Sequence, residues 1–105
     1  METPNLNYIE ELARGDNSIK LSLITIIKNE FPEEKQEYYT NFKNREYKKI
    51  EESVHKIKHK ISILGLEKSY EKANLFEHNL RNKSIENSSD FEQILNLITA
   101  YIKTI

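Results

Sequence analysis

The most constraining feature of the sequence is a run of apolar residues spaced alternately three and four positions apart. Its members are Tyr47, Ile50, Val54, Ile57, Ile61 and Leu64. Because an α-helix turns once every 3.6 residues or so, about the mean of these steps, the six side chains share one face. The spacing therefore predicts an amphipathic helix from Glu46 to Leu64. A helix with one apolar face needs partners that bury it, so the rest of the chain has to supply them.

The first half of the chain predicts further helices. Thr3-Pro4 is suited to begin a short first helix, because proline is favoured at the first helical position, and Gly15 is suited to end it. Asp16 is a good N-cap for the next stretch. Pro32 lacks an amide hydrogen, so it either kinks that helix or splits it in two. The apolar residues expected to face the core here are Leu6, Ile9, Leu12, Ile19, Leu23, Ile26 and Ile27.

The second half predicts two more helices after the central one. Gly65 is suited to the left-handed conformation that ends a helix, and Leu66 begins the next. Residues 82–88 are polar and predict a loop. Ser89 and Glu92 have the spacing of a capping box, which predicts a last helix that runs to the C-terminus.

Together these stretches define the expected architecture. Amphipathic helices joined by short links bury their apolar faces by packing against one another. We expect an all-α protein: an antiparallel four-helix bundle with a short extra N-terminal helix and a kink or break near Pro32. The 105 residues suit a single domain over 1–105, and two glycines with two prolines provide little material for the many turns of a sandwich or barrel.

The composition excludes several classes of function. Sixteen Lys and Arg against seventeen Asp and Glu give a net charge of −1, which provides no global field for a nucleic acid. The absence of cysteine removes disulfides, thiolate nucleophiles and cysteine-based zinc sites, and it suits a reducing compartment. No apolar run is long enough to span a bilayer, so we expect a cytoplasmic protein without membrane insertion.

The side of the central helix opposite its apolar stripe carries the residues most suited to chemistry. The solvent-facing strip is expected to hold Glu51, Glu52, His55, Lys58, His59 and Ser62. Lys58 and His59 follow His55 by three and four residues, so both stack beside it. A lysine can neutralise phosphate oxygens while a neutral imidazole acts as the nucleophile, and this combination favours a phosphoryl group over a cation.

The same stretch resembles the signature of histidine-containing phosphotransfer (HPt) domains. From Val54 to Leu66 it reads V-H-K-I-K-H-K-I-S-I-L-G-L, and the family commonly has A-H-x-L-K-G followed by five variable residues and a glycine. His55 stands at the phosphoacceptor position, Lys58 at the phosphate-side lysine and Gly65 at the later glycine. The resemblance therefore assigns a phosphotransfer role to this face.

Further positions extend the resemblance over most of the chain, with one departure. The segment from Leu12 to Asp16 looks like the family's L-x-x-G-D, and Phe76-Glu77 stands where the family often has an apolar residue and a glutamate. Four residues after the histidine, where the family usually has glycine, this sequence has His59. Its side chain either crowds the phosphohistidine or the incoming partner, swings aside, hydrogen-bonds a phosphate oxygen or competes as an acceptor, so we regard His59 as a modulator of the site.

The resemblance implies a phosphorelay carrier. His55 would accept a phosphoryl group from the phosphoaspartate of a receiver domain and pass it to another receiver. Lys58 would provide the main electrostatic help, with Lys56 and Lys60 as rim contacts. The chain has no G-x-x-x-x-G-K-[ST] loop, so it would have no kinase or ATP-binding activity and no cofactor of its own, and Mg²⁺ would belong to the receiver.

The same resemblance implies the partners. These would be the receiver domains of response regulators and a hybrid histidine kinase, docking on a monomer through apolar surface near the histidine. The candidates for that contact are Leu6, Ile9 and Leu21, of which the first two also suit the core.

Three other interpretations use the same residues. A noncatalytic helical adaptor would keep the fold but lose transfer, with His59 as the disabling change. A metal-binding bundle would use His55 and His59 with Glu52 nearby, but a stable site needs a third and usually a fourth ligand. Nucleic-acid binding through the lysines between 48 and 60 ranks last, because acidic residues interrupt them.

Overall fold

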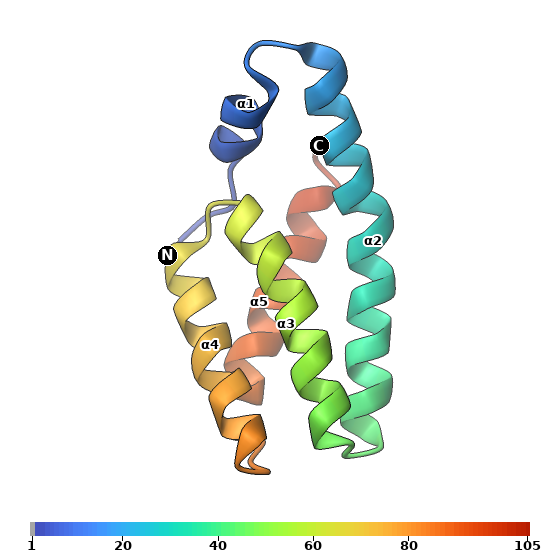
Figure 1. Cartoon of the computed structure of the whole chain (residues 1–105), viewed down its shortest axis with the longest axis vertical. Coiled ribbons are helices and arrows are strands. Elements are labelled where there is room, and N and C mark those ends of the chain that lie inside the picture. Colours follow the sequence, from blue (N-terminus) through green and yellow to red (C-terminus); the bar gives the residue numbers. More distant parts are fainter. Residues whose placement is uncertain (1) are drawn as a thin grey trace.

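The computed structural model describes residues 2–105, which are all-helical and contain no strand. Five helices follow one another: α1 (Asn7–Ala13), α2 (Asn17–Lys43), α3 (Tyr47–Ile63), α4 (Glu67–Arg81) and α5 (Ser88–Ile102) (Figure 1). The expectation of an all-α protein with a short first helix is confirmed. The central helix begins and ends within one residue of the bounds predicted from the apolar spacing.

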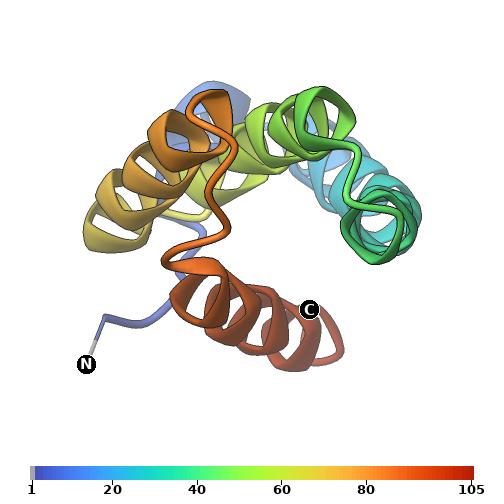
Figure 2. The same ribbon diagram turned by 90° about the horizontal axis from the view of Figure 1, so that it is seen from below.

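The four longer helices form a bundle around one core. α3 packs against α2 on one side and α4 on the other, and α5 contacts both α4 and α2. Figure 2 shows this end-on, with α5 closing the bundle on the side away from α3. α1 packs against the first turns of α2. At about 1.5 Å per residue, the 27 residues of α2 account for most of the 44 Å length of the molecule.

The core is filled by the apolar stripe of α3 and by aromatic rings from its neighbours. Ile50, Val54, Ile57, Ile61 and Leu64 have no exposed surface. The ring of Tyr38 on α2 lies 6.3 Å from that of Phe76 and 5.0 Å from that of Phe91, so one cluster ties α2, α4 and α5 together. Burial, reinforced by the carboxylate of Glu92, raises the pKa of Tyr38 above its usual value, and its hydroxyl remains a donor to Glu92 Oε2 (3.3 Å).

Two predicted helix starts are wrong, and one is confirmed. α1 begins at Asn7 rather than at Pro4, because Asn5 Oδ1 accepts the Asn7 amide (3.0 Å) and sets the first turn there. α5 begins at Ser88, directly after Asn87 in a left-handed conformation, so Ser89 lies inside the helix and forms no capping box. Asp16 does cap α2, where Oδ1 accepts the amides of Ser18 (2.9 Å) and Ile19 (3.3 Å).

α2 continues through Pro32 as one helix, so the predicted alternative of two helices is wrong. Proline leaves the carbonyl of Lys28 without its amide partner, which weakens the helix at this point. Phe31 and Tyr38, one on each side of the proline, are both fully buried in the same core. This shared packing holds the two halves together against the local cost.

The turn between α3 and α4 requires its glycine, as predicted. Gly65 has φ +74°, and a Cβ at this position would lie 2.6 Å from the side-chain nitrogen of Asn5. The Asn5 amide donates to the Leu64 carbonyl (2.9 Å), which fixes the N-terminal segment over the turn. Glycine is therefore needed both for the left-handed backbone and for the close approach of another segment.

In Figure 1, α1 and the first turns of α2 extend beyond the ends of the other helices. Leu12, Ile19 and Ile26 were expected in the core, but each is nearly half exposed at 45–47%. Their apolar spacing predicted burial, and the structure corrects this. The apolar side chains that face the core here are Ile9, Ile24 and Ile27, so Leu12, Ile19 and Ile26 lie outside the buried stripe. No helix in residues 2–105 is both long and apolar enough to cross a membrane.

Candidate functional site

His55 lies in the middle of α3 and faces outward, as predicted. Its neighbours Val54 and Ile57 are fully buried, and this anchors the helix so that the imidazole is directed away from the core. The side chain is 57% exposed, and its Nδ1 lies 3.5 Å from Glu77 Oε2 on α4. An accessible ring with one nitrogen beside a carboxylate is therefore present on this face.

Glu77 is a buried carboxylate at the centre of the charged contacts. Its side chain is 7% exposed, and Oε1 lies 2.7 Å from Lys58 Nζ. Oε2 accepts a hydrogen bond from Arg81 Nη2 (3.0 Å), one turn later on α4. A buried charge is costly unless it is paired, and here two basic side chains lie at ion-pair distance from it. The sequence had indicated Glu77 only through the resemblance to the HPt pattern, and its part as the hub of these contacts was missed.

Lys58 was expected on the solvent-facing strip, and this expectation is wrong. The residue is only 8% exposed, its Nζ donates to Asn74 Oδ1 (2.6 Å), and the ammonium lies 5.2 Å from the centre of the Tyr70 ring. The reason is that α4 packs along this edge of α3, so the position three residues after His55 falls into the seam between the helices. Lys58 is part of the α3–α4 packing.

The two other lysines expected at the rim are also paired. Lys60 is 7% exposed and faces α2, where its Nζ contacts Glu30 (2.8 Å) and Glu34 (3.3 Å). Its expected place at the rim is therefore wrong. Lys56 is exposed and lies 3.4 Å from Glu37. Burial raises the pKa of Glu34, and the nearby Lys60 offsets this only in part.

His59 lies on the same outer face as His55. Its side chain is exposed, and the two imidazole rings are 5.3 Å apart between centres, edge to face at 67°. Within residues 2–105, no group of three or more His, Cys, Asp and Glu side chains is placed to hold a metal ion. The two histidines therefore form a pair without further ligands in the described part of the chain.

The three apolar docking candidates differ in accessibility. Leu21 is 56% exposed, whereas Ile9, on the inner face of α1, is completely buried. Leu6 is partly buried against the core. Only Leu21 offers most of its side chain to a partner.

A hollow of about 470 Å³ lies beside His55. Its walls come from α3 and α4 and consist of Lys48, Glu51, Glu52, His55, Lys56, Glu77 and Arg81. The guanidinium of Arg81 on α4 connects the two helices. Its Nε donates to Glu51 Oε2 on α3 (2.7 Å), and its Nη2 donates to Glu77 Oε2 on α4. These contacts raise the pKa of Arg81 and keep it charged beside the imidazole.

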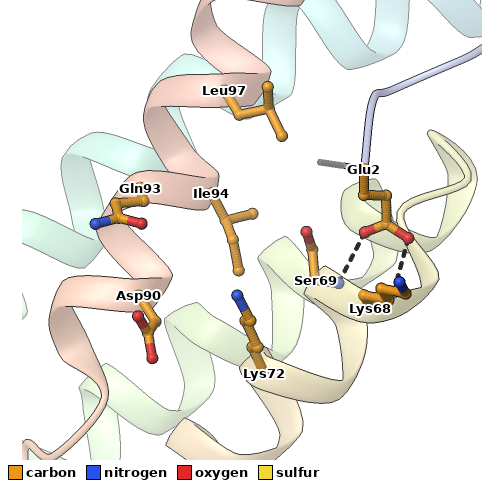
Figure 3. Close-up of a pocket in the computed structure, with 8 residues that line it drawn as sticks. All are labelled: Glu2, Lys68, Ser69, Lys72, Asp90, Gln93, Ile94 and Leu97. Atoms are coloured by element: carbon orange, nitrogen blue, oxygen red, sulfur yellow. Dashed lines mark hydrogen bonds between the residues drawn. The ribbon is translucent and has the colours of Figure 1, made fainter.

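A second hollow, of about 480 Å³, lies between α4 and α5 (Figure 3). Glu2 closes one side of it, where its carboxylate accepts the amides of Lys68 (2.8 Å) and Ser69 (2.9 Å) at the start of α4. Although desolvation acts in the opposite sense, these hydrogen bonds lower the pKa of Glu2. Figure 3 shows Ile94 and Leu97 directed into the same space. Its lining includes Ser69 and Lys72 but no histidine, and it does not include His55.

The contacts around His55 define what the site can do chemically. A carboxylate beside Nδ1 favours the tautomer with the proton on Nδ1, which leaves the lone pair on the outward Nε2. Such a ring is a nucleophile with an oriented lone pair. Searches against protein-family models, curated proteins and solved structures find no match for this chain, so the function is argued from this geometry and from the resemblance in the sequence.

Proposed function

We propose that this chain is an HPt-type phosphotransfer domain, with α2–α5 as its antiparallel four-helix bundle. His55 accepts a phosphoryl group from the phosphoaspartate of a receiver domain and passes it to a second receiver. The observation that carries the proposal is the exposed imidazole of His55, whose Nδ1 faces the buried Glu77 at 3.5 Å. The match of His55, Lys58 and Gly65 to the HPt signature supports it.

The transfer step follows from the orientation of the ring. The lone pair of His55 Nε2 attacks phosphorus in line, the bond between phosphorus and the aspartate oxygen breaks, and the carboxylate recovers the electron pair. The ring gains positive charge, and its Nδ1 proton faces Glu77. Glu77 thus stabilises the charge that develops during attack. Lys58 contributes by holding Glu77 in place, because its own ammonium is buried.

The partner supplies what this chain lacks. The receiver domain brings the Mg²⁺ and the aspartate, and this chain adds no cofactor of its own. Receiver domains and a hybrid histidine kinase are the proposed partners of a monomeric protein acting in the cytoplasm. Leu21 is the exposed apolar residue available for their docking among those expected from the sequence.

A noncatalytic adaptor is the second candidate function, and one observation favours it. His59 lies 5.3 Å from His55, between ring centres, at a position where the HPt family usually has no side chain. If that ring blocked an incoming receiver, the domain would bind partners without receiving phosphate. The two functions differ in whether acid-labile phosphate forms on the chain.

A phosphotransfer assay distinguishes the two functions. Receivers encoded in the same genome are phosphorylated with acetyl phosphate and mixed with the wild-type chain, His55→Gln and His59→Gln. His78→Gln is the matched control, because His78 is an exposed histidine on α4. We expect acid-labile phosphate on the wild type and on His78→Gln, and none on His55→Gln. Phosphate that persists in His55→Gln but disappears in His59→Gln would reject the assignment of His55.

A further inference from the structure

The three lysines nearest to His55 in sequence are all engaged with carboxylates. Each pair joins α3 to a neighbouring helix: Lys58–Glu77 (2.7 Å), Lys60–Glu30 (2.8 Å) and Lys56–Glu37 (3.4 Å). Lys58 and Lys60 are also buried, so neither ammonium can reach the outer edge of the His55 ring without breaking its ion pair. The positive charge that the sequence places around His55 is thus largely balanced within the fold.

His59 differs from these lysines. It is exposed, and no carboxylate within residues 2–105 lies at ion-pair distance from it. Side chains of an α-helix lean towards its N-terminus, so His59 leans over the turn that carries His55. This agrees with the edge-to-face contact of the two rings at 5.3 Å. A phosphoryl group on His55 Nε2 adds oxygens two bonds beyond a ring whose centre lies 5.3 Å from that of His59.

The carboxylates on this face also affect where the phosphoryl oxygens of a phosphorylated His55 lie. Glu52 is exposed one turn before His55 on the same side of α3, and its charge repels a phosphoryl group from that end. Glu77 lies beneath the ring and is balanced by Lys58 and Arg81. Arg81 in the hollow on the α4 side is exposed, but its guanidinium is already shared between Glu51 and Glu77. The phosphoryl oxygens are therefore favoured on the side where His59 lies.

We propose that His59 is the side chain that hydrogen-bonds the phosphoryl group on His55, in place of Lys58. The inference rests on the proposed function only in taking His55 as the acceptor. A ring N–H of His59 donates to a phosphoryl oxygen, and the bond is charge-assisted because its acceptor is anionic. No bond to His59 forms, and the only covalent change is at His55 Nε2.

Phosphoramidate tests this proposal without a receiver domain. Its P–N bond breaks as His55 Nε2 attacks phosphorus, and ammonia leaves. The loading rate of His55 is followed by ³¹P NMR and peptide mass spectrometry in the full-length wild type, His59→Gly, His59→Lys and the control His78→Gln. We expect the loading rate of His55 to be about fivefold lower in His59→Gly than in the wild type, because one charge-assisted hydrogen bond at an exposed site is lost. We expect His59→Lys to restore the rate and His78→Gln to leave it unchanged.

Two results would overturn the inference. Equal or faster loading in His59→Gly would show that the side chain is idle or obstructs the site. Phosphate found on His59 itself would show that it competes as an acceptor.

A second measurement separates this inference from the proposed function. Wild-type protein loaded on His55 is mixed with receiver domains, and the transfer of phosphate is followed. A fivefold effect of His59→Gly on loading, without transfer to any receiver, supports the role of His59 and rejects the phosphorelay. Transfer to a receiver, with equal loading in His59→Gly, supports the phosphorelay and rejects the role of His59.

Discussion

Lys58 and Lys60 stand two residues apart on α3, yet they enter opposite seams of the bundle. Two residues correspond to a turn of about 200° around the helix. Lys58 therefore faces α4, where it holds Glu77 beside His55, and Lys60 faces α2, where it binds Glu30 and Glu34. Both ammonium groups are buried, but only one of them is connected to the candidate site.

The two seams also differ in the quality of their pairing. Glu77 has a second cation in Arg81, and it lies beside His55 as well. On the other side, the Glu30 side chain is 54% exposed and that of Glu34 is 17% exposed, against 7% for Glu77. Glu34 and Glu77 each have one buried oxygen without a hydrogen-bond partner, so the two seams differ in burial and in the number of cations. The α3–α4 pair is thus the tighter one. The comparison indicates that the ion pair beside the histidine contributes more to stability than the pair on the far side.

The largest expected effect comes from removing the carboxylate of the tighter pair. Glu77→Ala leaves the Lys58 ammonium buried with only Asn74 as a polar partner, which lowers the free energy of unfolding by about 3 kcal/mol. Urea denaturation at neutral pH measures this loss. Glu77→Gln is the matched control, because it keeps a polar oxygen at the same place, and it should lose less. A loss below about 1 kcal/mol in Glu77→Ala would show that the pair contributes little to stability.

Replacing each lysine in turn compares the two seams directly. Lys58→Met should lower the free energy of unfolding by about 2 kcal/mol, because the nearly fully buried Glu77 loses a cation. Lys60→Met should lower it by about 1 kcal/mol, because Glu30 reaches solvent and Glu34 is partly exposed. Thermal or urea unfolding of the two variants side by side measures the difference. A larger loss for Lys60→Met would reverse the order of the two seams.

The smallest expected effect is the pH dependence of stability that Glu34 causes between α2 and α3. Because the pKa of Glu34 is raised by burial, the folded protein binds this proton more tightly than the unfolded chain does. The wild type should therefore lose stability relative to Glu34→Gln as the pH rises from the usual value of 4.5 through the raised pKa, and the difference should be constant above it. Unfolding free energies from about pH 4 to about pH 8 test this. A difference that changes in the opposite direction would mean that Lys60 outweighs desolvation.

The sequence was sufficient to predict α3 and the exposure of His55. Periodicity gives the angle of each side chain around the helix, and the apolar stripe from Ile50 to Leu64 defines which angle is buried. It could not show that Lys58 is buried, because its angle is at the edge of the stripe. Only the position of α4 decides whether that edge is open or covered. Glu77 was likewise identifiable by its place in a motif, while its contacts depend on how α3 and α4 approach each other.

Local signals were less reliable where packing competes with them. Pro32 is a helix breaker by its chemistry, but the buried Phe31 and Tyr38 keep α2 continuous. The apolar residues Leu12 and Ile26 fit a helical stripe, but their direct neighbours Ala13 and Ile27 face the core instead. In both cases the outcome depends on distant parts of the chain, which a local pattern does not contain.

The projecting start of α2 has a consequence for how the molecule opens. Ile19 is 45% exposed near this end, whereas Tyr38, further along the same helix, has no exposed surface. Local opening requires less free energy where fewer apolar contacts are broken. Amide hydrogens near Ile19 should therefore exchange with solvent well before those near Tyr38, although both belong to one uninterrupted helix. The chain can fray at this end while α3 and α4 keep the imidazole of His55 in place.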